Sequence, residues 1–165
     1  MKNMKQYITF SLLAAIVLAG GCKPELEEIG PAYVAGEGIY GTWEIATVKQ
    51  VDLTQPIPES RDISSFFTAD PSRRTQISFS KENNAYTVPQ IGALPKMLKT
   101  TGSWAFDTLP FPSKITFISE ANDTFVAPIH NMPREIDQHF GFDLTRKDSC
   151  GTNYLRYELD FKRIN

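Results

Sequence analysis

The stretch that decides the fold lies near the end of the chain and reads Leu155-Arg156-Tyr157-Glu158-Leu159-Asp160-Phe161-Lys162. Apolar and charged side chains alternate along the whole stretch. Successive side chains of a β-strand point to opposite faces of a sheet. The alternation therefore predicts a strand with one buried and one solvated face.

Similar patterns recur earlier in the chain, each bounded by turn residues. They cover residues 42–51, 76–80, 86–88, 103–106, 114–118, 123–129 and 140–145. Residues 62–67 are compatible with a short helix or lid. With residues 155–162, the count is about eight antiparallel strands, which favours an all-β fold, either an up-and-down β-barrel or a β-sandwich. We expect the barrel, because closure of the sheet removes exposed strand edges.

The N-terminus has the features of a secretory signal. Two lysines, Lys2 and Lys5, precede an apolar run over residues 7–19, which is shorter than the ~20 residues that span a bilayer. The sequence Leu18-Ala19-Gly20-Gly21-Cys22 that follows resembles a bacterial lipobox. In that family of signals the cysteine thiol is diacylated and the signal peptidase cuts just before it. The resemblance implies a signal peptide over residues 1–21 and a lipid anchor on Cys22, which would attach the protein to a membrane.

Residues 22–38 are predicted to be a tether between the anchor and a single domain over residues 39–165. The segment is rich in proline, glycine and glutamate and offers little to bury. Its acidic cluster Glu25, Glu27 and Glu28 resembles the export signals of surface-exposed lipoproteins in diderm bacteria; the alternative is a solvated tether. We therefore expect a cell-envelope protein anchored to the outer membrane, in either the periplasmic or the surface leaflet.

Composition and charge exclude several classes of protein. The 165 residues are 41% hydrophobic and 22% charged, with 17 basic against 19 acidic side chains, so no basic surplus favours nucleic acid. The length allows one modest core. If Cys22 is acylated, Cys150 has no partner for a disulfide. We expect Cys150 to be a buried small hydrophobe rather than a reactive thiol.

A family resemblance rests on Gly41-Thr42-Trp43 at the first predicted strand, repeated as Gly102-Ser103-Trp104. A glycine two residues before a tryptophan at this position resembles the lipocalin-type signature. With the lipobox and the acidic tether, it is similar to a lipocalin-like family of small bacterial lipoproteins. The resemblance implies that Gly41 and Trp43 close one end of the barrel and that Arg163 packs across the indole ring. The alternative is two core tryptophans in an unrelated sandwich.

Residues that could carry chemistry are few. Glu135, Asp137 and His139 would share one strand face with Asp143, and such a set can bind a divalent cation. That face is the outer one by parity, so we interpret it as solvated strand surface. No metal-binding, nucleophilic or phosphate-binding motif occurs. We therefore predict no catalytic residue, no cofactor and no metal.

Aromatic residues support binding better than catalysis. Either they fill the interior of a small barrel, or some of them line a cup for a small apolar molecule or a glycan. The candidates for the cup are Tyr86, Trp104, Phe106, Phe125 and Phe142. The first hypothesis is therefore a ligand-binding envelope lipoprotein. The alternative is a structural or accessory lipoprotein with a filled barrel, which contacts an envelope protein partner.

Overall fold

The structure is a computed structural model that describes residues 35–92, 98–134 and 138–164. Short helices occupy little of it: η1 (Ala35–Ile39), α2 (Ser64–Thr68), η2 (Pro71–Arg73) and η3 (Glu82–Asn84). The strands are β1 (Gly41–Asp52), β2 (Glu59–Asp62), β3 (Gln76–Phe79), β4 (Ala85–Gln90), β5 (Thr101–Phe106), β6 (Lys114–Ser119), β7 (Thr124–Asn131), β8 (His139–Lys147) and β9 (Asn153–Arg163). Among the described residues, no helix has the length and apolar character needed to cross a membrane.

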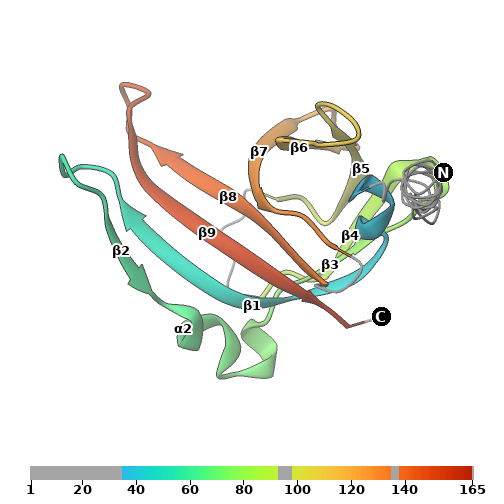
Figure 1. Cartoon of the computed structure of the whole chain (residues 1–165), viewed down its shortest axis with the longest axis horizontal. Helices are drawn as coiled ribbons and strands as arrows, with labels where there is room; N and C mark the ends of the chain where they lie inside the picture. Colours follow the sequence, from blue (N-terminus) through green and yellow to red (C-terminus); the bar gives the residue numbers. More distant parts are fainter. Residues whose placement is uncertain (1–34, 93–97, 135–137, 165) are drawn as a thin grey trace, which may run out of the picture. The chain divides into compact units, whose positions relative to one another are not determined.

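The sheet closes on itself. From β3 to β9 each strand pairs antiparallel with the next, β3 pairs with β1, and β9 also pairs with β1. In Figure 1, β8, β9 and β1 run side by side as the long strands of the fold. The result is an eight-stranded antiparallel barrel, with β2 added at the edge of β1. The predicted barrel is thereby confirmed over the sandwich.

Strand β2 was not predicted from the sequence. All of its residues are exposed, so it carries no apolar alternation. It forms because β1 is longer than β3 and continues past it. The first part of β1, from Gly41, pairs with β3, and the last part, up to Asp52, pairs with β2. The backbone groups of that free edge are thus satisfied. The following residues form α2, which bears out the short helix expected near residues 62–67.

The core follows from side-chain alternation along the strands. On β9, Leu159 and Phe161 are fully buried, as the pattern of this stretch predicts. On β1, the inward set shifts by one residue after Ile45, because a bulge lies between Ile45 and Thr47 in the pairing with β9. Val48 is therefore buried while Thr47 faces outward. The same bulge lets Thr47 reach Asp160 on the outer surface.

The two ends of the barrel differ in what they carry. The N-terminal end is the end at which η1 leads into β1; the β3–β4, β5–β6 and β7–β8 connections also lie there, because the strands alternate in direction. The opposite end holds the β1–β2, β6–β7 and β8–β9 connections. Helix η1 lies at the end of the segment predicted as tether, and its Gly36 is buried against Leu109 of the β5–β6 loop.

One expectation about a cysteine is wrong. Cys150 is exposed and unpaired among the described residues, instead of being a buried small hydrophobe. It sits in the β8–β9 turn, where its backbone N–H donates to Asp148 Oδ1 at 2.9 Å. The turn extends beyond the core, so no apolar surface is available there to cover the thiol.

Candidate functional site

The barrel interior is filled by aromatic rings. Phe117 lies centrally, with ring centroids 5.1 Å from Tyr86, 5.6 Å from Phe142 and 6.2 Å from Phe79. Phe79 in turn meets Trp104 edge to face at 5.6 Å. These distances are those of directly packed aromatic pairs. The rings therefore fill the part of the interior that their strands enclose.

The five aromatic residues predicted to line a cup do not surround one common space. Tyr86, Trp104 and Phe142 are at most 5% exposed and belong to the packed core. Phe106 and Phe125 are partly buried and pack against it. Trp104 Nε1 is a buried donor for which the described part of the chain offers no acceptor.

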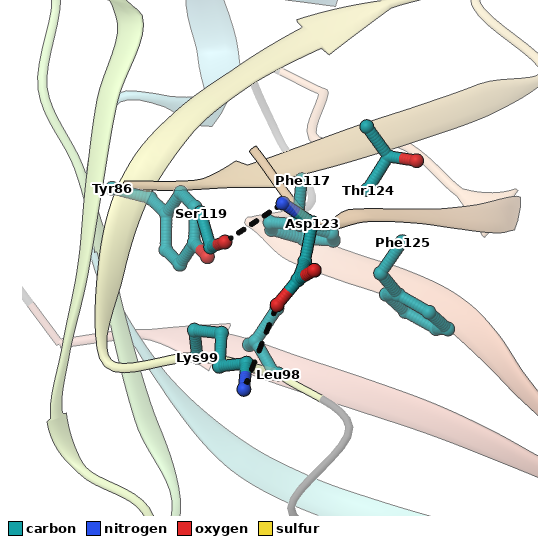
Figure 2. Close-up of a pocket in the computed structure, with 8 residues that line it drawn as sticks. All are labelled: Tyr86, Leu98, Lys99, Phe117, Ser119, Asp123, Thr124 and Phe125. Carbon is teal, nitrogen blue, oxygen red and sulfur yellow. Dashed lines mark hydrogen bonds and ion pairs between the residues drawn. The ribbon is translucent and has the colours of Figure 1, made fainter. Parts of the chain in front are cut away.

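A small recess lies beside Tyr86, Phe117 and Phe125, toward the β6–β7 turn (Figure 2). Its volume is about 50 Å³, whereas ligand pockets usually measure ~300 Å³ or more. Its polar wall is held by Ser119, whose hydroxyl accepts a hydrogen bond from Asp123 N at 3.1 Å. Asp123 also forms an exposed ion pair with Lys99 at 3.8 Å, which contributes little to stability. The recess has room for water or for a small part of a ligand.

Trp43 closes the N-terminal end of the barrel. Its ring is fully buried, and its Nε1 donates to the carbonyl of Ile39 at 2.6 Å. The guanidinium carbon of Arg163 lies 5.6 Å from the centre of the Trp43 ring, and its Nη2 donates to the carbonyl of Tyr40. The contact that the lipocalin-type resemblance implies between Trp43 and Arg163 is thus present. Gly41, which opens the strand, has a positive φ of 124° that favours glycine.

The strongest polar cluster lies on the outer surface and was not predicted. His130 on β7 is held between two carboxylates: its Nδ1 lies 2.7 Å from Asp143 Oδ1 on β8, and its Nε2 lies 3.2 Å from Asp160 Oδ1 on β9. Thr47 on β1 donates to the other oxygen of Asp160 at 3.2 Å. Arg156 Nε lies 3.8 Å from Asp143 Oδ2. The cluster, here called the His130 clip, joins four neighbouring strands.

Local backbone features place the ring of His130. The β7–β8 pairing shifts register between Ile129 and Asn131, so His130 sits in an irregularity that re-aims its side chain. The ring then lies over Gly141 of β8. A Cβ on Gly141 would approach His130 Nε2 to 2.4 Å and Asp160 Oδ1 to 2.6 Å. The absence of a side chain at Gly141 therefore makes the clip possible.

The clip fixes the charge of His130. Hydrogen bonding to Asp143, and secondarily to Asp160, raises the pKa of His130 to about 9, against the opposing effect of burial. The same contact with His130 lowers the pKa of Asp160. Near pH 7 both ring nitrogens therefore donate to carboxylates, and neither can accept a proton as a general base would. The arrangement suits a structural ion cluster rather than an acid–base site.

The described residues do not bring together the side chains considered above as a possible cation site. Glu135 and Asp137 lie outside them. His139 is exposed on β8, while Asp143 turns to His130. Within the ranges that the structure describes, no group of three or more His, Cys, Asp or Glu side chains could hold a metal ion.

No family model and no curated protein matches this chain. The His130 clip could have been anticipated in part, because alternation places Asp143 and Asp160 on the outer faces of adjacent predicted strands. The bulge that brings His130 to them has no signature in the sequence.

Proposed function

We propose that this protein is a lipid-anchored lipoprotein of the bacterial cell envelope whose barrel serves as a filled, ligand-free interaction module. The lipobox-like sequence ending at Cys22 supports the anchor. The acidic tether supports a place at the outer membrane, in the surface or the periplasmic leaflet. The barrel would act as an accessory subunit that presents its outer surface to other envelope components.

The observation that carries this proposal is the packing of the interior. Phe117 is 1% exposed and contacts aromatic rings from β3, β4 and β8. A ligand of ordinary size would have to displace these rings. Interiors packed in this way resist such displacement, because each lost contact also leaves a void. The first hypothesis, a barrel that binds a small apolar molecule or a glycan, is therefore less favoured than a filled barrel.

Catalysis also has little support in the described part of the chain. The best-connected histidine, His130, is locked by two carboxylates and has no nucleophile between them. Thr47, the nearest hydroxyl of the cluster, donates to Asp160 rather than to the imidazole. We propose a binding or structural role, with no cofactor.

Native mass spectrometry tests the proposal on protein taken from the membranes of its own host. We expect a polypeptide that begins at Cys22 and carries acyl chains, with no further mass lost on denaturation. Cys22→Ala should abolish both acylation and cleavage before residue 22. Cys150→Ala is the matched control, because it removes the other cysteine and should change neither.

Two results would contradict the proposal. A Cys22→Ala variant that is still cut and still membrane-bound would exclude the lipid anchor. A non-covalent small molecule released from the intact barrel on denaturation would return the ligand-binding hypothesis to first place.

A further inference from the structure

The β5–β6 loop at the N-terminal end of the barrel presents large apolar side chains to solvent. Leu109 is 65% exposed, and Phe111 is 83% exposed. Phe111 stands between Pro110 and Pro112, whose rings restrict the backbone around it. An exposed apolar tip of this kind marks a contact surface when it is held in place rather than free to collapse onto the protein.

The loop is held from within by one side chain. The Asp107 carboxylate accepts hydrogen bonds from the backbone N–H groups of Thr108, Ser113 and Lys114, at 2.9–3.0 Å, and from the Ser113 hydroxyl at 2.5 Å. Thr108 Oγ1 donates to the carbonyl of Phe111 at 3.1 Å. These bonds, of which the Ser113 hydroxyl contributes most, lower the pKa of Asp107 to about 2. The ionised carboxylate is thus bonded by its own loop, which holds the tip in one conformation.

The loop lies where the predicted tether joins the barrel. A Cβ built on Gly36 of η1 would lie 3.0 Å from Leu109 Cδ2 and 3.5 Å from Phe106 Cε2. Cys22 stands 13 residues before Ala35, so the intervening chain can reach at most about 45 Å when fully extended. The chain that follows the anchor therefore enters the barrel at this end, beside the β5–β6 loop.

From these observations we infer that the β5–β6 loop inserts Leu109 and Phe111 into the interface of the membrane that holds the Cys22 anchor. The inference rests on the lipid anchor of the proposed function and adds an orientation to it: the barrel stands with its N-terminal end on the bilayer. Phe and Leu side chains are suited to the headgroup–acyl boundary, about 5–10 Å deep. Lys114, exposed at the base of the loop, is placed for contact with anionic headgroups.

The opposite end offers a matched control. Ile57, in the β1–β2 connection, is 81% exposed, nearly as much as Phe111. It is a single apolar side chain at the end of the barrel remote from η1. If exposure alone caused membrane contact, Ile57 and Phe111 would behave alike.

The experiment uses the full acylated protein in vesicles of phosphatidylethanolamine and phosphatidylglycerol, with phosphatidylcholine brominated near the headgroup end of its acyl chains. Phe111→Trp and Ile57→Trp each add one fluorophore to the two buried tryptophans, Trp43 and Trp104. The emission of the unsubstituted protein is measured separately and subtracted as the baseline. We expect brominated lipid to reduce the added emission of Phe111→Trp at least about twofold, as for a ring at the interface. The added emission of Ile57→Trp should stay unchanged.

Each other result overturns the inference and identifies what failed. If the acylated protein floats with the vesicles and Phe111→Trp remains open to aqueous iodide, the loop does not insert. If Phe111→Trp is shielded from iodide but not quenched by brominated lipid, the loop contacts protein instead. If the protein is neither acylated nor vesicle-bound, the anchor itself is refuted, and the orientation with it.

Discussion

The His130 clip predicts how the stability of the barrel depends on pH. The perturbation is His130→Gln, which keeps a polar side chain of similar size but removes the positive charge. In the folded protein, hydrogen bonds to Asp143 and Asp160 raise the pKa of His130 from 6.5 to about 9. The folded state therefore binds the proton more tightly than the unfolded state. The resulting stabilisation is complete below about pH 6.5 and is lost as the pH rises through about 9.

The magnitude follows from that difference in pKa. At about 1.4 kcal/mol for each pKa unit, the rise from 6.5 to about 9 contributes at most about 3–4 kcal/mol to the free energy of unfolding. About a third of the His130 side chain is solvent-exposed, at 32%, and solvent screening reduces the contribution to about 1–2 kcal/mol. The other charges facing the ring are those of Asp143, Asp160 and, through Asp143, Arg156.

Urea unfolding at several values between pH 6 and pH 10 measures the effect. We expect the unsubstituted protein to exceed His130→Gln in free energy of unfolding by about 1–2 kcal/mol at pH 6. The difference should shrink to near zero by pH 10. His139→Gln is the matched control, because it replaces the other histidine, which lies outside the clip, and other titrating groups cancel in each comparison. Parallel curves for the protein and His130→Gln over this range would refute the reasoning, as would an imidazole pKa below 7 by NMR.

Three further predictions concern packing and exposure. Gly102→Ala should lower the free energy of unfolding by about 2–3 kcal/mol, because the added Cβ would lie 2.1 Å from the backbone oxygen of Ile118; a loss below 0.5 kcal/mol in urea unfolding would contradict the strand spacing. Trp43→Phe should lower the free energy of unfolding by about 1–2 kcal/mol more than Trp104→Phe, because of the two indoles only that of Trp43 donates a hydrogen bond, and its loss leaves a buried carbonyl unpaired. Equal losses in the same assay would refute this. Cys150 should react with a thiol reagent in the native protein as fast as in mild urea, and a reaction that requires unfolding would show the thiol to be covered.

Local alternation alone was enough to locate most of the strands and to orient their side chains. Along residues 155–162 parity predicted the burial of Leu159 and Phe161 without knowledge of any partner strand, whereas Leu155 and Tyr157 on the same face are only half-buried. The contact between Arg163 and Trp43, in contrast, was expected from the lipocalin-type resemblance, and it is present. Closure into a barrel followed from the need of amphipathic strands to bury one face and satisfy their edges.

Features that depend on a second strand could not be read from one. Strand β2 has no apolar pattern, and it forms because β1 extends beyond the end of β3 and leaves an edge to pair with. The bulge at His130 depends on the register of β7 against β8, and the clip depends further on β9. The contacts among the residues of the clip could not be predicted from the sequence, because strand register is set by contacts across the sheet.

How closely the aromatic residues pack inside the barrel depends on tertiary structure alone. Composition supplied the rings, and a filled barrel and a cup need the same inward-facing residues. The outcome depends on how the volumes of Tyr86, Phe117 and Phe142 add up inside eight closed strands, and the described residues around Tyr86 and Phe117 enclose a recess of about 50 Å³. By itself, the sequence determined which side chains face inward, because alternation is local. Only the closed barrel decided how much space remains between them, because packing is a property of all strands together.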